Sequence, residues 1–152
     1  MFVQAGIAQD AKTVVAGATW WSAWRTPLAG GEAAIYWEAT LGRWSSEPDD
    51  SRHGSALVTQ IGLTPVLRWQ PADERFFLEA GIGANLLLPI YRSREKRFST
   101  AFNFGDHIAI GKRLGDANQH EVSLRLQHFS NAGIKEPNPG EDFLQLRYSH
   151  RF

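Results

Sequence analysis

The sequence predicts an all-β protein: an eight-stranded antiparallel up-and-down β-barrel that crosses a membrane. Three observations support this prediction. Apolar and polar residues alternate with period two in eight runs, separated by short segments rich in Gly, Pro and Asp. One parity of these runs is rich in Phe, Leu and Ile over roughly ten residues, the length of a tilted membrane strand. Tryptophans stand near the ends of the runs, as an aromatic girdle at a membrane interface requires: Trp20, Trp21, Trp24, Trp44 and Trp69.

Composition narrows the class further. The 152 residues predict a single domain over 1–152. The 16 basic and 16 acidic residues balance, which argues against a nucleic-acid partner because phosphate neutralisation needs a basic surplus. No cysteine is present, so disulfides and thiolate metal sites are excluded. No apolar window is long enough for a transmembrane helix, and we find no basic-then-apolar signal peptide.

The first four predicted strands cover 2–9, 13–24, 33–44 and 56–69. The third shows the alternation most clearly, with Ile35, Trp37 and Leu41 on one side and Tyr36 and Glu38 on the other. Proline and paired glycines predict a turn over 25–32, and acidic and proline residues predict a polar loop over 45–55.

The last four predicted strands cover 76–88, 98–114, 120–130 and 142–152. Turns are expected over 71–74 and 115–118, and a loop over 89–97. An even number of strands closes a barrel without an open edge, which hydrocarbon requires because unpaired backbone groups cannot be hydrated there.

A soluble ligand-binding barrel is the competing architecture, with the apolar parity turned inward. Strand length, the placement of the tryptophans and the final strand ending on Phe152 favour the membrane barrel. Eight strands fill their interior with side chains, so we expect no pore. Any activity should therefore lie on the loops or on the outer wall.

One stretch carries the parts of a hydrolytic triad. His128 and Ser130 share the parity of the leucines of run 120–130, and Asp142 shares the parity of the leucines in the last run. Polar groups facing hydrocarbon are costly, so they indicate function. A serine becomes nucleophilic when an imidazole takes its proton and a carboxylate orients that imidazole. Parity selects Asp142 as the acid, whereas a local bulge would select Glu141 instead.

Other residues of this end are candidates for supporting roles. The expected oxyanion donors and supporting residues lie in the connection that follows Ser130: Asn131, Ala132, Gly133 and Asn138. With both termini in the periplasm, this connection opens at the outer leaflet. Loop 89–97 opens on the same side, and its cations are candidates for binding lipid phosphates: Arg92, Arg94, Lys96 and Arg97. The competing interpretation is an ordinary hairpin end beside a solvated charged loop.

A second acid–histidine pair, Asp106 and His107, lies in the run 98–114. Asp106 has the outward parity of Phe104 and Ile108, and His107 has the inward parity. The sequence leaves a supporting role for Asp106 open.

The motif His-Phe-Ser-Asn-Ala-Gly-Ile-Lys-x-Pro-Asn-x-Gly-x-acid, which begins at His128, resembles the signature of the lipid A 3-O-deacylase (PagL) family of outer-membrane enzymes. The similarity extends to residues 77–83 and 103–106. The resemblance implies an outer-membrane barrel that hydrolyses the 3-position ester of lipid A in lipopolysaccharide, at the outer-leaflet level, and releases a 3-hydroxy fatty acid. It implies a Ser-His-Glu triad on the outer wall and no metal or organic cofactor.

Carried over to this chain, Ser130 is the nucleophile, His128 is the base and position 142 holds the acid. The family pattern has Glu there, whereas this chain has Asp142. The expected partners are lipopolysaccharide and membrane lipid, and the sequence allows a homodimer without requiring one. The alternative function is a non-enzymatic barrel for adhesion or membrane organisation that has kept the family scaffold.

Overall fold

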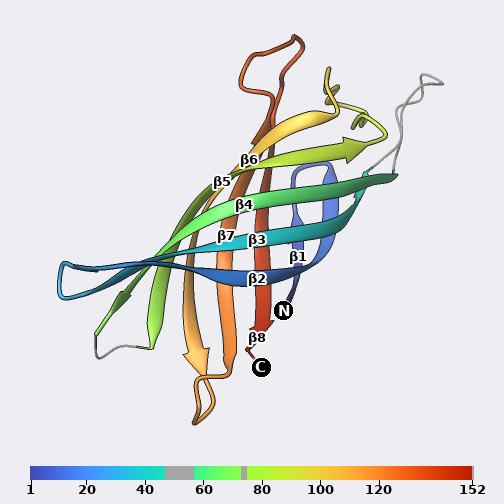
Figure 1. Ribbon diagram of the computed structural model, residues 1–152. Helices are drawn as coiled ribbons and strands as arrows, with labels where there is room; N and C mark the ends of the chain where they lie inside the picture. The colour runs from blue at the N-terminus through green and yellow to red at the C-terminus, as the bar shows by residue number, and fades with distance from the viewer. Residues whose placement is uncertain (47–56, 73–74, 152) are drawn as a thin grey trace.

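The computed structural model describes residues 1–46, 57–72 and 75–151. Every strand pairs antiparallel with its neighbours in the chain, and β8 pairs with β1, which closes the barrel (Figure 1). Within the described residues, no helix is long and apolar enough to span a membrane. The eight strands are β1 (Phe2–Ile7), β2 (Ala11–Leu28), β3 (Gly31–Ser46), β4 (Leu57–Pro71), β5 (Phe76–Leu88), β6 (Phe102–Leu114), β7 (His120–Ser130) and β8 (Glu141–His150).

The predicted strand order and number are confirmed, and most strand ends lie within two residues of the prediction, but two predicted boundaries are wrong by four residues. β2 continues to Leu28 through the segment 25–28, which was predicted as a turn. Its register against β3 shifts between Trp21 and Arg25, and β1 pairs only with residues 12–17 of β2. Pro27 therefore lies in a part of β2 that pairs with β3 on one side and with none of the described strands on the other, and proline is tolerated in such edge segments.

The second wrong boundary is the start of β6, which begins at Phe102 rather than at residue 98. Phe98 is buried, and its ring contacts the Tyr91 ring at 5.2 Å between centroids. Burial of this ring takes the segment 98–101 away from the barrel wall and into the β5–β6 connection. Most of the predicted loop 45–55, part of the predicted turn 71–74, Ala56 and Phe152 lie outside the described residues.

The wall is apolar outside and polar inside. Large hydrophobic side chains such as Leu126, Ile108 and Leu146 are exposed on the outer face. Charged side chains such as Glu38 and Arg125 are buried in the interior. This distribution is the reverse of that in a soluble barrel and is typical of a barrel surrounded by lipid. The soluble-barrel alternative is therefore contradicted.

The buried charges are paired across the interior. Arg125 Nη1 donates to Glu38 Oε1 at 2.9 Å, and Arg147 also pairs with Glu38. Arg68 Nε donates to Glu79 Oε1 at 2.7 Å. Charges removed from water need such partners, and these bonds cross-link strands that are distant in the sequence.

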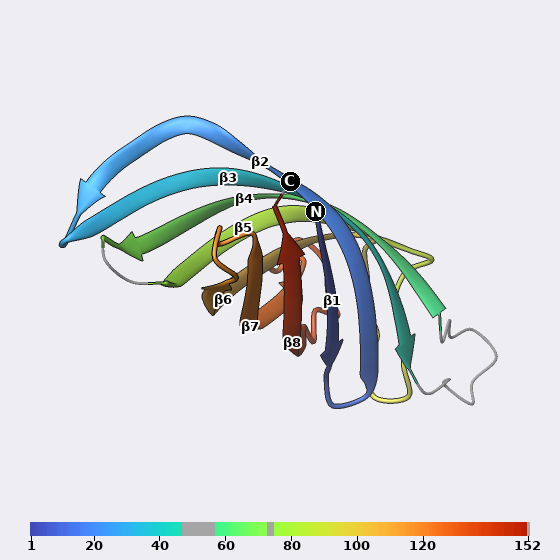
Figure 2. The ribbon, with the colours of Figure 1, turned by 90° about the horizontal axis from the view of Figure 1, so that it is seen from below.

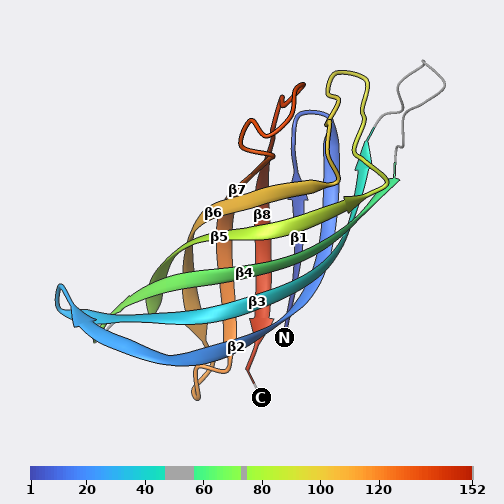
Figure 3. The same ribbon diagram turned by 45° about the horizontal axis from the view of Figure 1, so that its top comes forward.

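The two ends of the barrel differ. Trp44, Tyr91, Phe129 and Phe143 pack together inside one end, with the Trp44 ring centroid 4.7 Å from that of Phe143 and 4.8 Å from that of Phe129. The connections β1–β2, β5–β6 and β7–β8 lie at this end, which we call the loop end (Figure 3). Both termini lie together at the opposite end (Figure 2), where the Met1 amino group donates to the His150 carbonyl oxygen at 3.0 Å.

Candidate functional site

The β7–β8 hairpin determines which polar residues face outward. In the register of these strands His128 is opposite Asp142 and Phe129 is opposite Glu141, and the described pairs show no register shift. Side chains alternate between faces along a strand. His128, Ser130 and Asp142 therefore share the outer wall with Leu126 and Leu144, and the residues between them point inward.

The structure brings His128 and Asp142 into direct contact. His128 Nδ1 lies 2.7 Å from Asp142 Oδ1, and the side chains are 40% and 81% exposed on the outer wall. An ionised carboxylate only accepts hydrogen bonds, so Nδ1 is the protonated nitrogen in this pair. In the neutral imidazole the lone pair is then on the other ring nitrogen, Nε2, which is the arrangement that a general base requires.

Ser130 ends β7 and is followed by a tight turn. The Ile134 N–H donates to the Asn131 carbonyl oxygen at 3.1 Å, and Ala132 and Gly133 have φ values of 53° and 76°. Two consecutive positive φ angles are typical of a type I′ turn, in which glycine is favoured. The turn directs the Ala132 N–H towards Ser130 Oγ, 3.5 Å away.

The predicted supporting residues hold the connection in place. The Asn131 side chain is buried, donates to Ser99 Oγ at 3.0 Å and to the Lys135 carbonyl oxygen at 2.7 Å, and accepts the Gly133 N–H. Asn138 Oδ1 accepts the Asn131 N–H at 3.0 Å. The Gly133 N–H is thus already bonded to the Asn131 side chain, whereas the Ala132 N–H points towards Ser130 Oγ.

Glu141 lies inside the barrel, away from His128. Its side chain accepts the Tyr91 hydroxyl at 2.9 Å and the Lys96 ammonium at 2.8 Å. Burial raises the pKa of the Tyr91 phenol, so the hydroxyl keeps its proton and donates it. Glu141 therefore links the β5–β6 connection to β8. The bulge that would have made Glu141 the triad acid is absent from the described β7–β8 pairs.

The cations of the β5–β6 connection separate into two groups. Lys96, which we predicted as a phosphate ligand, pairs with the buried Glu141, because the chain folds this side chain inward. Arg94 and Arg97 are exposed and Arg92 is half-buried, with Arg92 and Arg97 opposite each other in an isolated β-bridge. These three arginines lie at the loop end.

Gly140 is a residue that the sequence reasoning missed. It has φ of 68°, and a Cβ built there would stand 2.6 Å from His128 Cε1. The absence of a side chain therefore makes room for the His128 ring. A glycine directly before the acidic pair was the available signal, but only the folded hairpin shows which ring it faces.

The second acid–histidine pair divides between the two faces. Asp106 is exposed on the outer wall, opposite His128 in the β6–β7 register, so that His128 has a carboxylate neighbour on each side. His107 is buried in the interior, where neither ring nitrogen has a hydrogen-bond partner among the described residues. Among those residues, no group of three or more His, Asp or Glu side chains could hold a metal ion.

Comparison with known proteins shows the family and the fold of the chain. The family described as lipid A 3-O-deacylase (PagL) matches residues 11–151. A relative from Bordetella bronchiseptica named lipid A deacylase PagL is 41% identical over 136 residues, 90% of this chain and 67% of the relative. One from Pseudomonas aeruginosa with the same name is 30% identical over 145 residues, 92% of this chain and 78% of the relative. The crystal structure of the outer membrane enzyme PagL superposes with a TM-score of 0.81 and 26% identity, over the whole of both chains.

Proposed function

The chain belongs to the lipid A 3-O-deacylase (PagL) family, and on that premise we propose that Ser130, His128 and Asp142 hydrolyse the 3-position acyl ester of lipid A. The protein is thus a carboxylic ester hydrolase of the outer membrane whose substrate is lipopolysaccharide. The observation that carries the proposal is the 2.7 Å contact between His128 Nδ1 and Asp142 Oδ1, on the outward face and two residues from a serine.

The chemistry follows from these three side chains. Ser130 Oγ attacks the ester carbonyl carbon while His128 Nε2 takes the hydroxyl proton. Asp142 holds the imidazole in the required tautomer and stabilises its positive charge. The proton passes to the leaving 3-oxygen of the sugar, which gives an acyl-serine. Water, activated by the same imidazole, then releases the 3-hydroxy fatty acid and restores Ser130.

The developing negative charge on the carbonyl oxygen needs donors that are already in place. We assign this role to the Ala132 N–H, which points towards Ser130 Oγ, and to the Asn138 side-chain NH2. Asn131 supports them through its buried bonds to Ser99 and Lys135, and Gly133 supports them by adopting the turn.

The surroundings of the triad suit a substrate that arrives from lipid. Leu126 and Leu144 flank the polar pair on the same face, and a hollow of about 510 Å³ lined by Ile7, Leu126, Asp142 and Leu144 lies beside the acid. An acyl chain in this hollow would present its ester to Ser130. With the termini in the periplasm, the loop end and the triad lie at the outer leaflet, where Arg92, Arg94 and Arg97 would face the lipid A phosphates.

The substitution Ser130→Ala tests the proposal. Loss of the nucleophile should lower the deacylation rate by about a millionfold, as in other triad hydrolases. Mass spectrometry of lipid A after incubation of lipopolysaccharide with the refolded protein measures this. Ser123→Ala is the matched control, since Ser123 lies on the same strand but inside the barrel. If Ser130→Ala deacylates as fast as the parent, the triad assignment is wrong and the non-enzymatic barrel gains support.

A further inference from the structure

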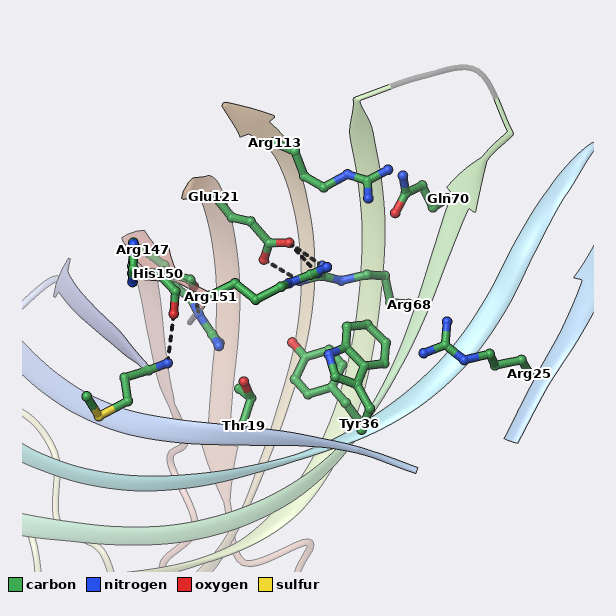
Figure 4. A pocket seen from close by; sticks show the side chains of 13 residues that line it. Thr19, Arg25, Tyr36, Arg68, Gln70, Arg113, Glu121, Arg147, His150 and Arg151 are labelled. Atoms are coloured by element: carbon green, nitrogen blue, oxygen red, sulfur yellow. Dashed lines mark hydrogen bonds and ion pairs between the residues drawn. The ribbon is translucent and has the colours of Figure 1, made fainter. Parts of the chain in front are cut away.

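The terminus end of the barrel holds a cavity that the deacylation mechanism does not use. Its volume is about 590 Å³, and its lining includes Met1, His150 and Arg151 at the termini. Figure 4 shows the side chains that line it. The closed interior predicted from the strand number is thus found at the loop end but not here. The charged side chains that line it are five arginines and a single carboxylate: Arg25, Arg68, Arg113, Arg147, Arg151 and Glu121.

Carboxylates in and beside the cavity already pair with several of these arginines. Glu32 pairs with Arg25 at 2.9 Å, and Glu79 pairs with Arg68 at 2.6 Å. Glu121 accepts from Arg68 Nη1 and Nη2 at 2.8 and 2.9 Å, and from Arg151 Nη2 at 3.1 Å. Deeper in the barrel, Glu38 forms ion pairs with both Arg147 and Arg125. Among the described residues, four carboxylates therefore face six arginines, counting Arg125, and Arg113 is the arginine to which no ion pair extends.

Arg113 carries the clearest unmet bonding capacity. Its Nε atom is buried and has no hydrogen-bond partner among the described residues. A buried N–H donor without an acceptor costs free energy, which a bound acceptor would recover. Figure 4 shows the Arg113, Arg68 and Arg25 side chains reaching towards the same space from β6, β4 and β2.

An aromatic ring keeps several of these cations close together. The guanidinium carbons of Arg25, Arg68 and Arg151 lie 5.5, 5.4 and 5.8 Å from the ring centroid of Trp21. Cation–π attraction offsets part of the repulsion among like charges. The remaining repulsion is relieved when an anion enters the cavity.

We propose that this cavity binds a phosphate-bearing anion. Guanidinium groups present planar forks of donors that match phosphate oxygens, and the Arg113 Nε–H lies among them. The volume falls in the range of small-molecule sites, so the cavity accommodates a phosphate ester as well as the bare ion. The ligand is either free phosphate in the adjoining aqueous compartment or the headgroup of a phospholipid in the nearer leaflet.

The binding test uses the whole refolded barrel in a non-ionic detergent. Inorganic phosphate is titrated at constant ionic strength, with chloride as the balancing anion, and binding is followed by calorimetry and by the NMR signal of the Arg113 Nε–H. Arg113→Gln should weaken phosphate binding by about tenfold, since it removes a charge-assisted donor. Lys112→Gln should leave binding unchanged. This substitution also removes one positive charge, but from an exposed side chain on the outer face, one residue away from Arg113.

A second variant and a second ligand source complete the test. Arg25→Gln should fold normally and also weaken binding, because the Arg25 side chain is 52% exposed and its one ion pair among the described residues, with Glu32, is exposed as well. In nanodiscs containing phosphatidylglycerol without added phosphate, a shift of the Arg113 signal assigns the ligand to a lipid headgroup, whereas a shift with inorganic phosphate alone assigns it to the free ion. The proposal is overturned if neither source moves the signal, or if Lys112→Gln weakens binding as much as Arg113→Gln.

Discussion

Two neighbouring acids of β8 face opposite ways and have opposite surroundings. Asp142 lies on the outer wall, exposed, with one contact to His128. Glu141 is fully buried and accepts bonds from Tyr91 and Lys96. Strand alternation alone separates them, since one residue along a strand changes the face. The hairpin thus places reactive groups on one side and the contacts that hold the loop end together on the other.

The strongest test of this difference is Asp142→Asn. An amide can donate to His128 Nδ1 and so favours the wrong tautomer, and we expect the rate of fatty-acid release to fall about 10⁴-fold, as for the equivalent change in a serine protease. Asp106→Asn is the control, because Asp106 is opposite His128 in the β6–β7 register, whereas the hydrogen bond of His128 Nδ1 is to Asp142. An equal loss in both variants would show that the two carboxylates act jointly.

Gly140→Ala should have the next largest effect. The added methyl group would meet the His128 ring and displace it from Asp142, which we expect to cost about a hundredfold in rate. Gly30→Ala is the matched control: Gly30 has a similar φ of 74° but no heavy atom within 4 Å of the added Cβ. Initial rates on lipopolysaccharide micelles measure both. Similar losses in the two variants would attribute the effect to backbone strain instead of ring displacement.

Glu141→Gln should act on stability more than on chemistry. Removing the carboxylate leaves the largely buried Lys96 without its partner, and we expect the free energy of unfolding to drop by about 3 kcal/mol. Urea unfolding in detergent measures this. The rate per folded molecule should fall far less than in Asp142→Asn. A variant that folds normally but loses activity as completely would make Glu141 the acid and reverse the assignment.

The double variant Glu141→Gln/Lys96→Met tests whether the unpaired Lys96 ammonium causes the loss of stability. If the unpaired ammonium is responsible, the double variant should recover part of the lost stability, because no buried charge then remains at this pair. No recovery would attribute the loss to the Tyr91 contact instead.

Alternation explains how much of this could be predicted from the sequence. The face occupied by His128, Ser130 and Asp142 follows from strand parity, because β7 and β8 are regular and bulge-free over the described pairs. Strand parity does not predict the structure of the connections between strands. The inward fold of Lys96, the burial of Phe98 and the contact of Gly140 with His128 all depend on segments that meet only in the closed barrel.

The long strands were also predicted only in part. Alternation cannot show that β2 continues past Trp21 through a register shift, since the shift itself breaks the period. The arginine-lined cavity escaped prediction for a related reason. Its cations come from four strands and the segment after β8, and each one taken alone is an ordinary charge near a strand end.

The smallest effect is expected for Asp142→Glu, which restores the acid of the family pattern. The longer side chain moves the carboxylate by roughly 1 Å, and the exposed position leaves room for it to adjust its rotamer and keep the bond to His128. We therefore expect the rate of 3-hydroxy fatty acid release to stay within about tenfold of the parent. Asp142→Asn removes the negative charge, whereas Asp142→Glu keeps the charge and lengthens the side chain. Comparing the two rates therefore separates the effect of the charge from that of side-chain length. A nearly inactive Asp142→Glu would mean that the hairpin of this chain has adapted to the shorter acid, and that position 142 does not follow the family residue for residue.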